Sequence, residues 1–249
     1  MAEIKDKIAI ITGSGGGIGG AIALRYAREG AKLALADIDA RTAESRTAEI
    51  SSMGCDAFAI VADVTDKKSV QQMVQTTVDR WGRIDILVNV AGGADRKPVV
   101  EMTETDWDYI VNMNLKSVFL CSQAVLPTML QQKYGKIVSI SSIYGFTGNA
   151  IRSSYAAAKA GVAVFTKSLA LEVVNDGINV NAIAPGRVAT LKVRGRYSDE
   201  QWAEALEQIP ARRAGSPDEI ASTALFLVLD ENRYITGQTI HVNGAWLNW

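Results

Sequence analysis

The stretch that decides the fold runs from Lys7 to Leu24 and reads KIAIITGSGGGIGGAIAL. Its first part is a nearly continuous hydrophobic run, which is typical of a strand buried on both faces of a parallel sheet. A glycine-rich turn from Thr12 to Gly19 follows, and a helical pattern begins directly after it at Ala21. Glycines permit positive φ angles and close approach of a diphosphate to backbone N–H groups, while the helix N-terminus supplies partial positive charge. The order strand, glycine turn, helix therefore predicts a dinucleotide-binding unit.

The same alternation of short apolar runs and longer helical stretches continues along the chain. Parallel strands need a crossover connection, and right-handed crossovers place helices on both faces of a sheet. We therefore expect an α/β fold: a single-domain, doubly wound parallel sheet of Rossmann type, with helices on both faces, over residues 1–249. The expected strands are Lys7–Thr12, Lys32–Asp37, Ala57–Val61, Ile84–Val90, Lys136–Ser141, Ile178–Ile183 and, last, Gln238–Val242.

One segment does not follow this alternation. Residues 189–210 are polar, carry Arg194 and Arg196, and interrupt the pattern before a helix that starts near Pro217. Because binding residues are often found on loops that a rigid scaffold positions, we predict a mobile substrate flap over a site at residues 189–210.

Composition and charge exclude several functions. Of 249 residues, 48% are hydrophobic and 21% are charged, and the net charge is −1, so no global field recruits nucleic acid or an anionic membrane. No stretch approaches the roughly 20 apolar residues that span a bilayer, and Met1–Asp6 contains no long apolar run. We therefore expect a cytoplasmic protein. Cys55, Cys121 and the single histidine, His241, are too few to suggest a disulfide framework or a metal site.

Asp37 ends the second expected strand, where a carboxylate can accept hydrogen bonds from the adenosine ribose hydroxyls. It would also repel a 2′-phosphate, and no basic residue stands at positions 14–16 to offset that repulsion. The sequence therefore favours NAD over NADP. The alternative is that Asp37 caps the next helix, a role that Asp39 could fill equally well. Asp63-Val64 and residues 89–92 follow neighbouring strands, where ligands of open parallel sheets bind.

Tyr155 and Lys159 are four residues apart in the alanine-rich segment Ser153–Asp176, which favours a helix and puts both on one face. A nearby ammonium stabilises a phenolate, so we expect Lys159 to lower the pKa of Tyr155, as a general acid/base requires. Ser142 closes the fifth expected strand, and a short loop can return its hydroxyl to Tyr155. Asn114 could hold a water that joins Lys159 to solvent. Alternatively, Tyr155 and Lys159 belong to an ordinary solvated helix face.

Taken together, these motifs cover essentially the whole chain, and the sequence resembles the short-chain dehydrogenase/reductase family. The matching residues are Thr12-Gly13 to Gly17-Ile18-Gly19, Asp63-Val64, Asn89 with Ala91-Gly92, Asn114, Ser142, Tyr155 with Lys159, and Pro185-Gly186 with Thr190. The family often has a second asparagine where Val90 stands and Asp-Gly-Gly where Asn243-Gly244-Ala245 stand. Neither departure removes a catalytic group, but the changed tail weakens any subunit contact inferred from it.

The resemblance implies a catalytic set of Asn114, Ser142, Tyr155 and Lys159. In it, Tyr155 donates or accepts the substrate proton, Ser142 orients the hydroxyl or carbonyl, Lys159 also binds the nicotinamide ribose, and Asn114 completes a proton relay. Val188 and Thr190 would meet the nicotinamide carboxamide. The full set of expected cofactor residues is Gly13, Gly16, Gly17, Ile18, Gly19, Asp37, Ile38, Asp63, Val64, Asn89, Ala91, Gly92, Tyr155, Lys159, Pro185, Gly186, Val188 and Thr190.

The predicted function is NAD(H)-dependent interconversion of a secondary alcohol and a ketone by hydride transfer. Within the same family the alternative is a 3-oxoacyl thioester reductase acting on acyl-carrier-protein or CoA substrates, an activity more often tied to NADP, which Asp37 disfavours. A non-catalytic dinucleotide sensor is the remote alternative, because every catalytic position is filled.

Basic residues on the expected ligand side suggest an anionic substrate, although exposed loops commonly carry arginine anyway. The candidate substrate residues are Tyr144, Arg152, Arg187 and Arg194, with Arg96-Lys97 and Arg196 nearby. The resemblance also suggests a homotetramer or a homodimer. Trp246 and Trp249 could bury a subunit contact, or the tail could fold back on its own chain.

Overall fold

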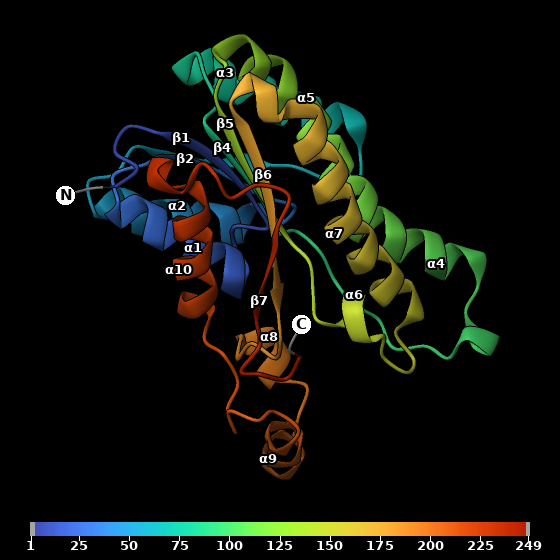
Figure 1. Cartoon of the computed structure of the whole chain (residues 1–249). Helices are drawn as coiled ribbons and strands as arrows, with labels where there is room; N and C mark the ends of the chain where they lie inside the picture. Colours follow the sequence, from blue (N-terminus) through green and yellow to red (C-terminus); the bar gives the residue numbers. More distant parts are fainter. Residues whose placement is uncertain (1–2, 248–249) are drawn as a thin grey trace.

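The computed structural model describes residues 3–247, so Trp249 lies outside the described residues. Within residues 3–247, seven strands form one fully parallel sheet in the order β3-β2-β1-β4-β5-β6-β7 (Figure 1). The predicted α/β, doubly wound sheet of Rossmann type is confirmed. The strands are β1 (Ile8–Thr12), β2 (Lys32–Asp37), β3 (Ala57–Val61), β4 (Ile86–Asn89), β5 (Gly135–Ile140), β6 (Ile178–Pro185) and β7 (Thr239–Val242).

Helices cover both faces of this sheet, as Figure 1 shows. One face carries α1 (Gly17–Arg28), α2 (Ala40–Ser52) and α10 (Pro217–Val228), and the other carries α3 (Lys67–Trp81), α5 (Ser117–Gln132) and α7 (Ser153–Val173). The shorter helical elements are α4 (Glu104–Val111), α6 (Tyr144–Thr147), α8 (Leu191–Arg194), α9 (Asp199–Glu207), the 3₁₀ turns η1 (Val99–Glu101), η3 (Val174–Asp176) and η4 (Asp230–Asn232), and the π-helical turn η2 (Asn112–Lys116).

Each strand side chain belongs to one of two apolar cores, because successive residues of a strand point to opposite faces. In β1, Ala9 and Ile11 pack under α1 and α10, whereas Ile10 packs under α3 and α5. All three are completely buried. Burial of one aliphatic side chain of this size contributes about 1.5–3 kcal/mol. This two-sided burial explains why the strand sequences are continuous apolar runs.

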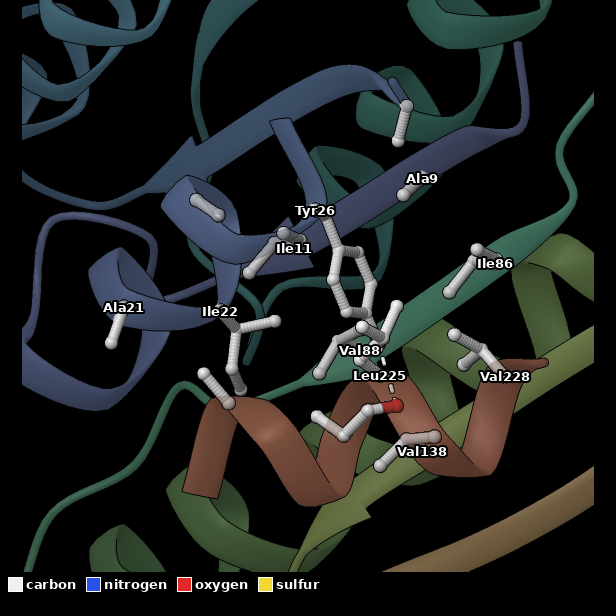
Figure 2. Close-up of a cluster of buried hydrophobic side chains, with 14 of the residues drawn as sticks. Ala9, Ile11, Ala21, Ile22, Tyr26, Ile86, Val88, Val138, Leu225 and Val228 are labelled. Atoms are coloured by element: carbon white, nitrogen blue, oxygen red, sulfur yellow. Dashed lines mark hydrogen bonds between the residues drawn. The ribbon is translucent and has the colours of Figure 1, made fainter. Parts of the chain in front are cut away.

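One buried polar contact joins the two helices of the first core. The Tyr26 hydroxyl of α1 donates a 2.9 Å hydrogen bond to the Ala224 carbonyl oxygen of α10, with Ile22 and Leu225 around it (Figure 2). Burial raises the pKa of the Tyr26 phenol above its usual value. The contact holds α10 against α1.

Residues 189–210 form two short helices, α8 and α9, beyond the carboxyl ends of β6 and β7 (Figure 1). A bridge between Val188 and Gly215 closes the base of the segment. In α9, Ser198 and Gln201 form a reciprocal capping box, which accounts for the start of that helix. Among the described helices none has both the length and the apolar character needed to cross a membrane.

Candidate active site

A cavity of about 260 Å³ lies where the carboxyl ends of β4, β5 and β6 meet, next to residues 186–197. Ligands of open parallel sheets bind at this edge, beside the switch point between β1 and β4. The structure brings all four predicted catalytic side chains to the cavity: Asn114, Ser142, Tyr155 and Lys159 line it together.

Lys159 is held at the sheet edge by a buried hydrogen bond. It lies on α7, one turn after Tyr155, and only 4% of it is exposed. Its Nζ donates a 2.7 Å hydrogen bond to the Ile140 carbonyl oxygen at the end of β5 and lies 5.7 Å from the centroid of the Tyr155 ring. Burial lowers the pKa of Lys159 to about 8. An ammonium that is this close to neutral can exchange a proton with its surroundings near physiological pH.

In the protein without a bound cofactor, the pKa of Tyr155 differs from the lowered value that the sequence predicted. Burial raises the pKa of the Tyr155 phenol above its usual value, and the Ser142 hydroxyl and the Arg152 guanidinium only partly oppose that rise. The expectation that Lys159 would lower the pKa of Tyr155 is therefore wrong for the chain alone. The physical reason is that burial disfavours the phenolate, and the Lys159 ammonium is directed at the Ile140 carbonyl oxygen.

Ser142 reaches Tyr155 because α6 turns the chain back against α7. The Ser142 Oγ accepts a 3.2 Å hydrogen bond from the Tyr144 N–H, and the neighbouring Ser141 Oγ donates to the Lys159 carbonyl oxygen. Gly145 permits the close approach, since a Cβ there would lie 2.7 Å from the Ala160 nitrogen. The predicted short return loop thus exists, with a turn of helix inside it.

Asn114 lies in the π-helical turn η2 between α4 and α5, and such turns are frequent at functional sites. It is completely buried. Its Nδ2 donates to the carbonyl oxygens of Gly93 and Ile110. A Cβ at Gly92 would lie 2.7 Å from the Asn114 Oδ1 and 3.6 Å from the Lys159 Nζ. Gly92 therefore leaves open a space that both polar atoms border.

The glycine turn fits a dinucleotide diphosphate. Gly13 has a φ of 65°, and a Cβ there would lie 2.9 Å from the Ala91 backbone. A Cβ at Gly19 would lie 2.1 Å from the Gly13 carbonyl oxygen, and one at Gly17 would lie 2.7 Å from the Thr190 side chain. The N-terminus of α1 has no side-chain cap and no acidic residue in its first turn. Its N–H groups are therefore available to an anion.

Asp37 is fixed beside this turn by two backbone donors. Its Oδ2 accepts a 3.0 Å hydrogen bond from the Gly15 N–H, and its Oδ1 accepts one of 3.1 Å from the Asp39 N–H. Asp39, not Asp37, caps α2 by accepting from the Arg41 N–H. The alternative interpretation of Asp37 as the helix cap is therefore wrong. Next to it, Ile38 is 69% exposed.

The remaining predicted cofactor residues lie along the same edge of the sheet. Asp63 holds its own loop, because its Oδ1 accepts from the N–H and the hydroxyl of Thr65. Asn89 donates to the Ser139 Oγ, and its Oδ1 is buried without a hydrogen-bond partner among the described residues. Those of the predicted cofactor residues that line the cavity are Ile18, Gly92, Tyr155, Lys159, Gly186 and Val188. Those outside it are Gly13, Gly16, Gly17, Gly19, Asp37, Ile38, Asp63, Val64, Asn89, Ala91, Pro185 and Thr190.

Three of the four candidate substrate residues, Tyr144, Arg152 and Arg187, line the cavity. Arg194 does not line this cavity, and its role toward the substrate stays a prediction. It forms an ion pair with Asp199 and donates to the Tyr197 carbonyl oxygen, so its charge is used inside the segment.

The sequence reasoning missed Tyr197, which lines the cavity from residues 189–210. The Arg96 guanidinium donates a 2.9 Å hydrogen bond to the Tyr197 hydroxyl, and the Arg187 guanidinium carbon lies 5.0 Å from its ring centroid. The sequence signal that could have identified Tyr197 is its position as an aromatic residue beside the basic residues of an otherwise polar segment. Trp246 packs edge-on against Tyr144, with centroids 6.2 Å apart, so this part of the tail folds back on its own chain.

Comparisons with known proteins agree with this geometry. Residues 13–246 match the family model described as enoyl-(acyl carrier protein) reductase. The chain is 43% identical over 240 residues to the 3-oxoacyl-(acyl-carrier-protein) reductase FabG of Staphylococcus aureus, covering 96% of this chain and 97% of that protein. It is 40% identical to FabG of Thermotoga maritima, covering 98% of each chain.

Two further proteins are similar over nearly the whole chain. The subunit BbsD of (2S)-((R)-hydroxy(phenyl)methyl)succinyl-CoA dehydrogenase from Thauera aromatica is 41% identical, covering 97% of each chain. The crystal structure of gox2181 superposes with a TM-score of 0.96 at 35% identity, covering 100% of this chain and 98% of the other.

Proposed function

The chain belongs to the short-chain dehydrogenase/reductase family, and from that premise we propose that it interconverts a 3-hydroxyacyl thioester and a 3-oxoacyl thioester with NAD(H). Membership makes it an oxidoreductase that acts on CH–OH groups with a nicotinamide dinucleotide. The observation that supports a thioester substrate comes from the relatives that match 96–98% of the chain. They are named as reductases or as a dehydrogenase of acyl thioesters. The sequence alone favoured a general secondary alcohol and kept the acyl thioester as the alternative. With these relatives, the acyl thioester is the better-supported substrate.

Tyr155 is the general acid/base. In reduction its phenol gives a proton to the substrate carbonyl oxygen as hydride reaches the carbon, and in oxidation the phenolate takes that proton back. The raised pKa of Tyr155 keeps the phenol protonated at neutral pH, which suits the reducing direction. Ser142 is next to Tyr155 in the cavity and offers its hydroxyl to the same substrate oxygen.

Lys159 and Asn114 return the proton to Tyr155. Their polar atoms border the space that Gly92 leaves open, where a water molecule would have both as partners. The low pKa of Lys159, about 8, allows it to pass a proton near neutral pH. A relay from solvent through Asn114 and Lys159 to Tyr155 follows from this arrangement.

A bound nicotinamide dinucleotide supplies or accepts the hydride. The uncapped N-terminus of α1 would hold its diphosphate, and Gly13, Gly17 and Gly19 let the turn before α1 pack closely against Ala91, Thr190 and its own backbone. Asp37, held by the Gly15 N–H, would accept from the hydroxyls of the adenosine ribose. The same carboxylate would repel a 2′-phosphate, so NAD is favoured over NADP, and this specificity is a proposal about this chain's own residues.

Residues 189–210 are proposed as the substrate flap, since Val193 and Tyr197 line the cavity from α8 and the turn after it. A homotetramer or a homodimer is proposed because large apolar side chains are exposed on the outer faces of two helices, Phe119 on α5 and Val164 and Leu171 on α7. Cytoplasmic location stays a prediction. A non-catalytic sensor is disfavoured because all four catalytic residues share one cavity.

The test is a substrate screen in both directions. We expect the purified protein to oxidise NADH with a 3-oxoacyl thioester and to prefer it over a plain ketone of the same chain length. We also expect NADH to be preferred over NADPH. Faster turnover of the plain ketone would restore the general alcohol interpretation, and preference for NADPH would contradict the role of Asp37.

A further inference from the structure

The cavity carries an unbalanced positive charge. The cationic side chains that line it are Arg152, Lys159, Arg187, Lys192 and Arg196. Among residues 3–247 no aspartate or glutamate lines the cavity. Asp95 follows the lining residue Ala94 in the sequence but is not itself a lining residue. A half-enclosed space with one sign of charge favours an anionic ligand.

Arg152 is partly buried, contacts a single aromatic ring, and has neither an ion pair nor a side-chain hydrogen bond among the described residues. Lys159 is hydrogen-bonded to Ile140, and Lys192 and Arg196 are exposed. The Arg187 guanidinium is surrounded by aromatic rings, with centroids between 5.0 and 5.8 Å from its carbon: those of Tyr197, Trp202 and Trp246.

The Arg152 guanidinium is positioned for a planar anion. Its carbon lies 5.6 Å from the centroid of the Tyr144 ring, and no ion pair or side-chain hydrogen bond engages it within the described part of the chain. A guanidinium against an aromatic ring can still use its N–H edge, which matches a carboxylate in a bidentate manner. Other arginines of this chain, such as Arg83 and Arg213, do pair with carboxylates.

The start of α7 strengthens this charge. Arg152 is the residue before the first turn of α7, and that turn contains no acidic residue. The helix N-terminus therefore adds uncompensated partial positive charge to that of the guanidinium. Because Tyr155 is three residues further along the same helix, an anion bound here lies near the reacting oxygen.

We propose that Arg152 binds a carboxylate on the acyl part of the substrate, so that the preferred substrates are 3-oxoacyl and 3-hydroxyacyl thioesters that carry a second, free carboxylate. This inference rests on the proposed function. A carrier phosphate is the other source of negative charge, but a pantetheine arm separates it from the reacting carbon by a long chain of bonds. The position of Arg152 beside Tyr144 and Tyr155 favours a group on the acyl part.

Arg152 also lowers the pKa of Tyr155, so a change in rate alone would not identify its role. The test therefore compares two substrates within each variant. One is a 3-oxoacyl N-acetylcysteamine thioester with a terminal carboxylate, and the other is its methyl ester; neither contains phosphate. The electrostatic effect on Tyr155 is common to both substrates and cancels in the ratio of their KM values.

We expect the wild type to bind the acid more tightly than the ester. Arg152→Gln should raise KM for the acid by roughly 10- to 100-fold, the loss expected for one charged hydrogen-bonded pair, and leave KM for the ester within about threefold. Arg28→Gln on the outer surface of α1 removes the same charge far from the cavity and should change neither KM. Equal effects of Arg152→Gln on acid and ester would overturn the proposal.

Two further arms separate the possible failures. The CoA thioester of the ester substrate tests the carrier phosphates: if Arg152→Gln raises KM only for CoA thioesters, regardless of the carboxylate, the acyl-carboxylate proposal is overturned. Calorimetric titration of the NADH-saturated protein with glutarate needs no turnover. Absence of turnover with every thioester would reject the proposed function. Even then, glutarate binding that Arg152→Gln abolishes would support the carboxylate site at Arg152. Glutarate binding that is unchanged in Arg152→Gln would reject that carboxylate site.

Discussion

The Lys159 ammonium donates a 2.7 Å hydrogen bond to the carbonyl oxygen of Ile140, and this bond joins α7 to the carboxyl end of β5. It fixes the position of the cation at the edge of the sheet where the cavity lies. It also buries the charge, and burial lowers the pKa of Lys159 to about 8. The same contact thus positions α7 and, in the proposed mechanism, leaves Lys159 able to transfer a proton near neutral pH.

Lys159→Met should stabilise the fold while it removes activity. The folded chain releases the Lys159 proton near pH 8, whereas the unfolded chain holds it up to its ordinary pKa of 10.5. Lys159 therefore lowers stability most below pH 8, and this cost fades as the pH rises towards 10.5. Because Lys159→Met also leaves the Ile140 carbonyl oxygen without its donor, which opposes the gain from removing the buried charge, we expect a net gain of only about 1–2 kcal/mol in free energy of unfolding at pH 7. Denaturant unfolding at pH 7 and pH 10 measures this, and a gain that is equal at both would contradict the assignment.

Asp37→Ala should change cofactor preference. Removal of the carboxylate takes away a ribose acceptor and the repulsion of a 2′-phosphate, so kcat/KM should fall for NADH and rise for NADPH. Asp39→Ala is the matched control, because Asp39 caps α2. It should cost about 1 kcal/mol of stability and leave the NADH to NADPH ratio unchanged. If both variants shift the ratio equally, Asp37 does not select the cofactor.

The pH profile of alcohol oxidation should follow Tyr155. Oxidation needs the phenolate and reduction needs the phenol, and burial raises the pKa of Tyr155 above its ordinary value of 10.0. Oxidation should therefore keep strengthening as the pH rises to 10, while reduction should weaken only above that pH. Arg152 lowers that pKa, so Arg152→Gln should move the oxidation profile of an uncharged substrate to higher pH. Arg28→Gln should leave the profile in place. A shift to lower pH in Arg152→Gln would contradict the electrostatic account.

Gly92→Ala should slow turnover by filling the space between Asn114 and Lys159. The added Cβ would lie 2.7 Å from the Asn114 Oδ1, so kcat should fall roughly tenfold or more. Gly93→Ala is the control, since its Cβ would meet only the flexible end of Met113. Steady-state rates of the two variants distinguish a specific relay from a general sensitivity of this loop.

Sequence predicted the sheet well because burial on both faces leaves continuous apolar runs. The prediction was least accurate at the end of β6, which extends to Pro185 and not Ile183, and at the start of β4, which begins at Ile86 and not at Ile84. Asp85 between them is completely buried, where its carboxylate accepts from the Ile8 N–H and pairs with Arg83. The Ile8 N–H belongs to a strand far away in the sequence, so no local pattern reveals this partner of Asp85.

The site was predictable in its residues but not in its interactions. Motif spacing identified Tyr155 and Lys159, because both lie on one helix face. It did not reveal that Arg194 pairs with Asp199 or that burial raises the pKa of Tyr155. These depend on how the segment 189–210 and the sheet enclose the cavity, and therefore on tertiary distances.

The most direct test of the account is the turnover of Tyr155→Phe alongside its affinity for NADH. Phenylalanine keeps the ring and removes the proton-transferring oxygen. We predict that the Kd for NADH stays within about threefold of the wild type while kcat for the 3-oxoacyl thioester falls by roughly 10²- to 10⁴-fold. Retention of wild-type turnover by a correctly folded Tyr155→Phe protein would contradict Tyr155 as the general acid/base.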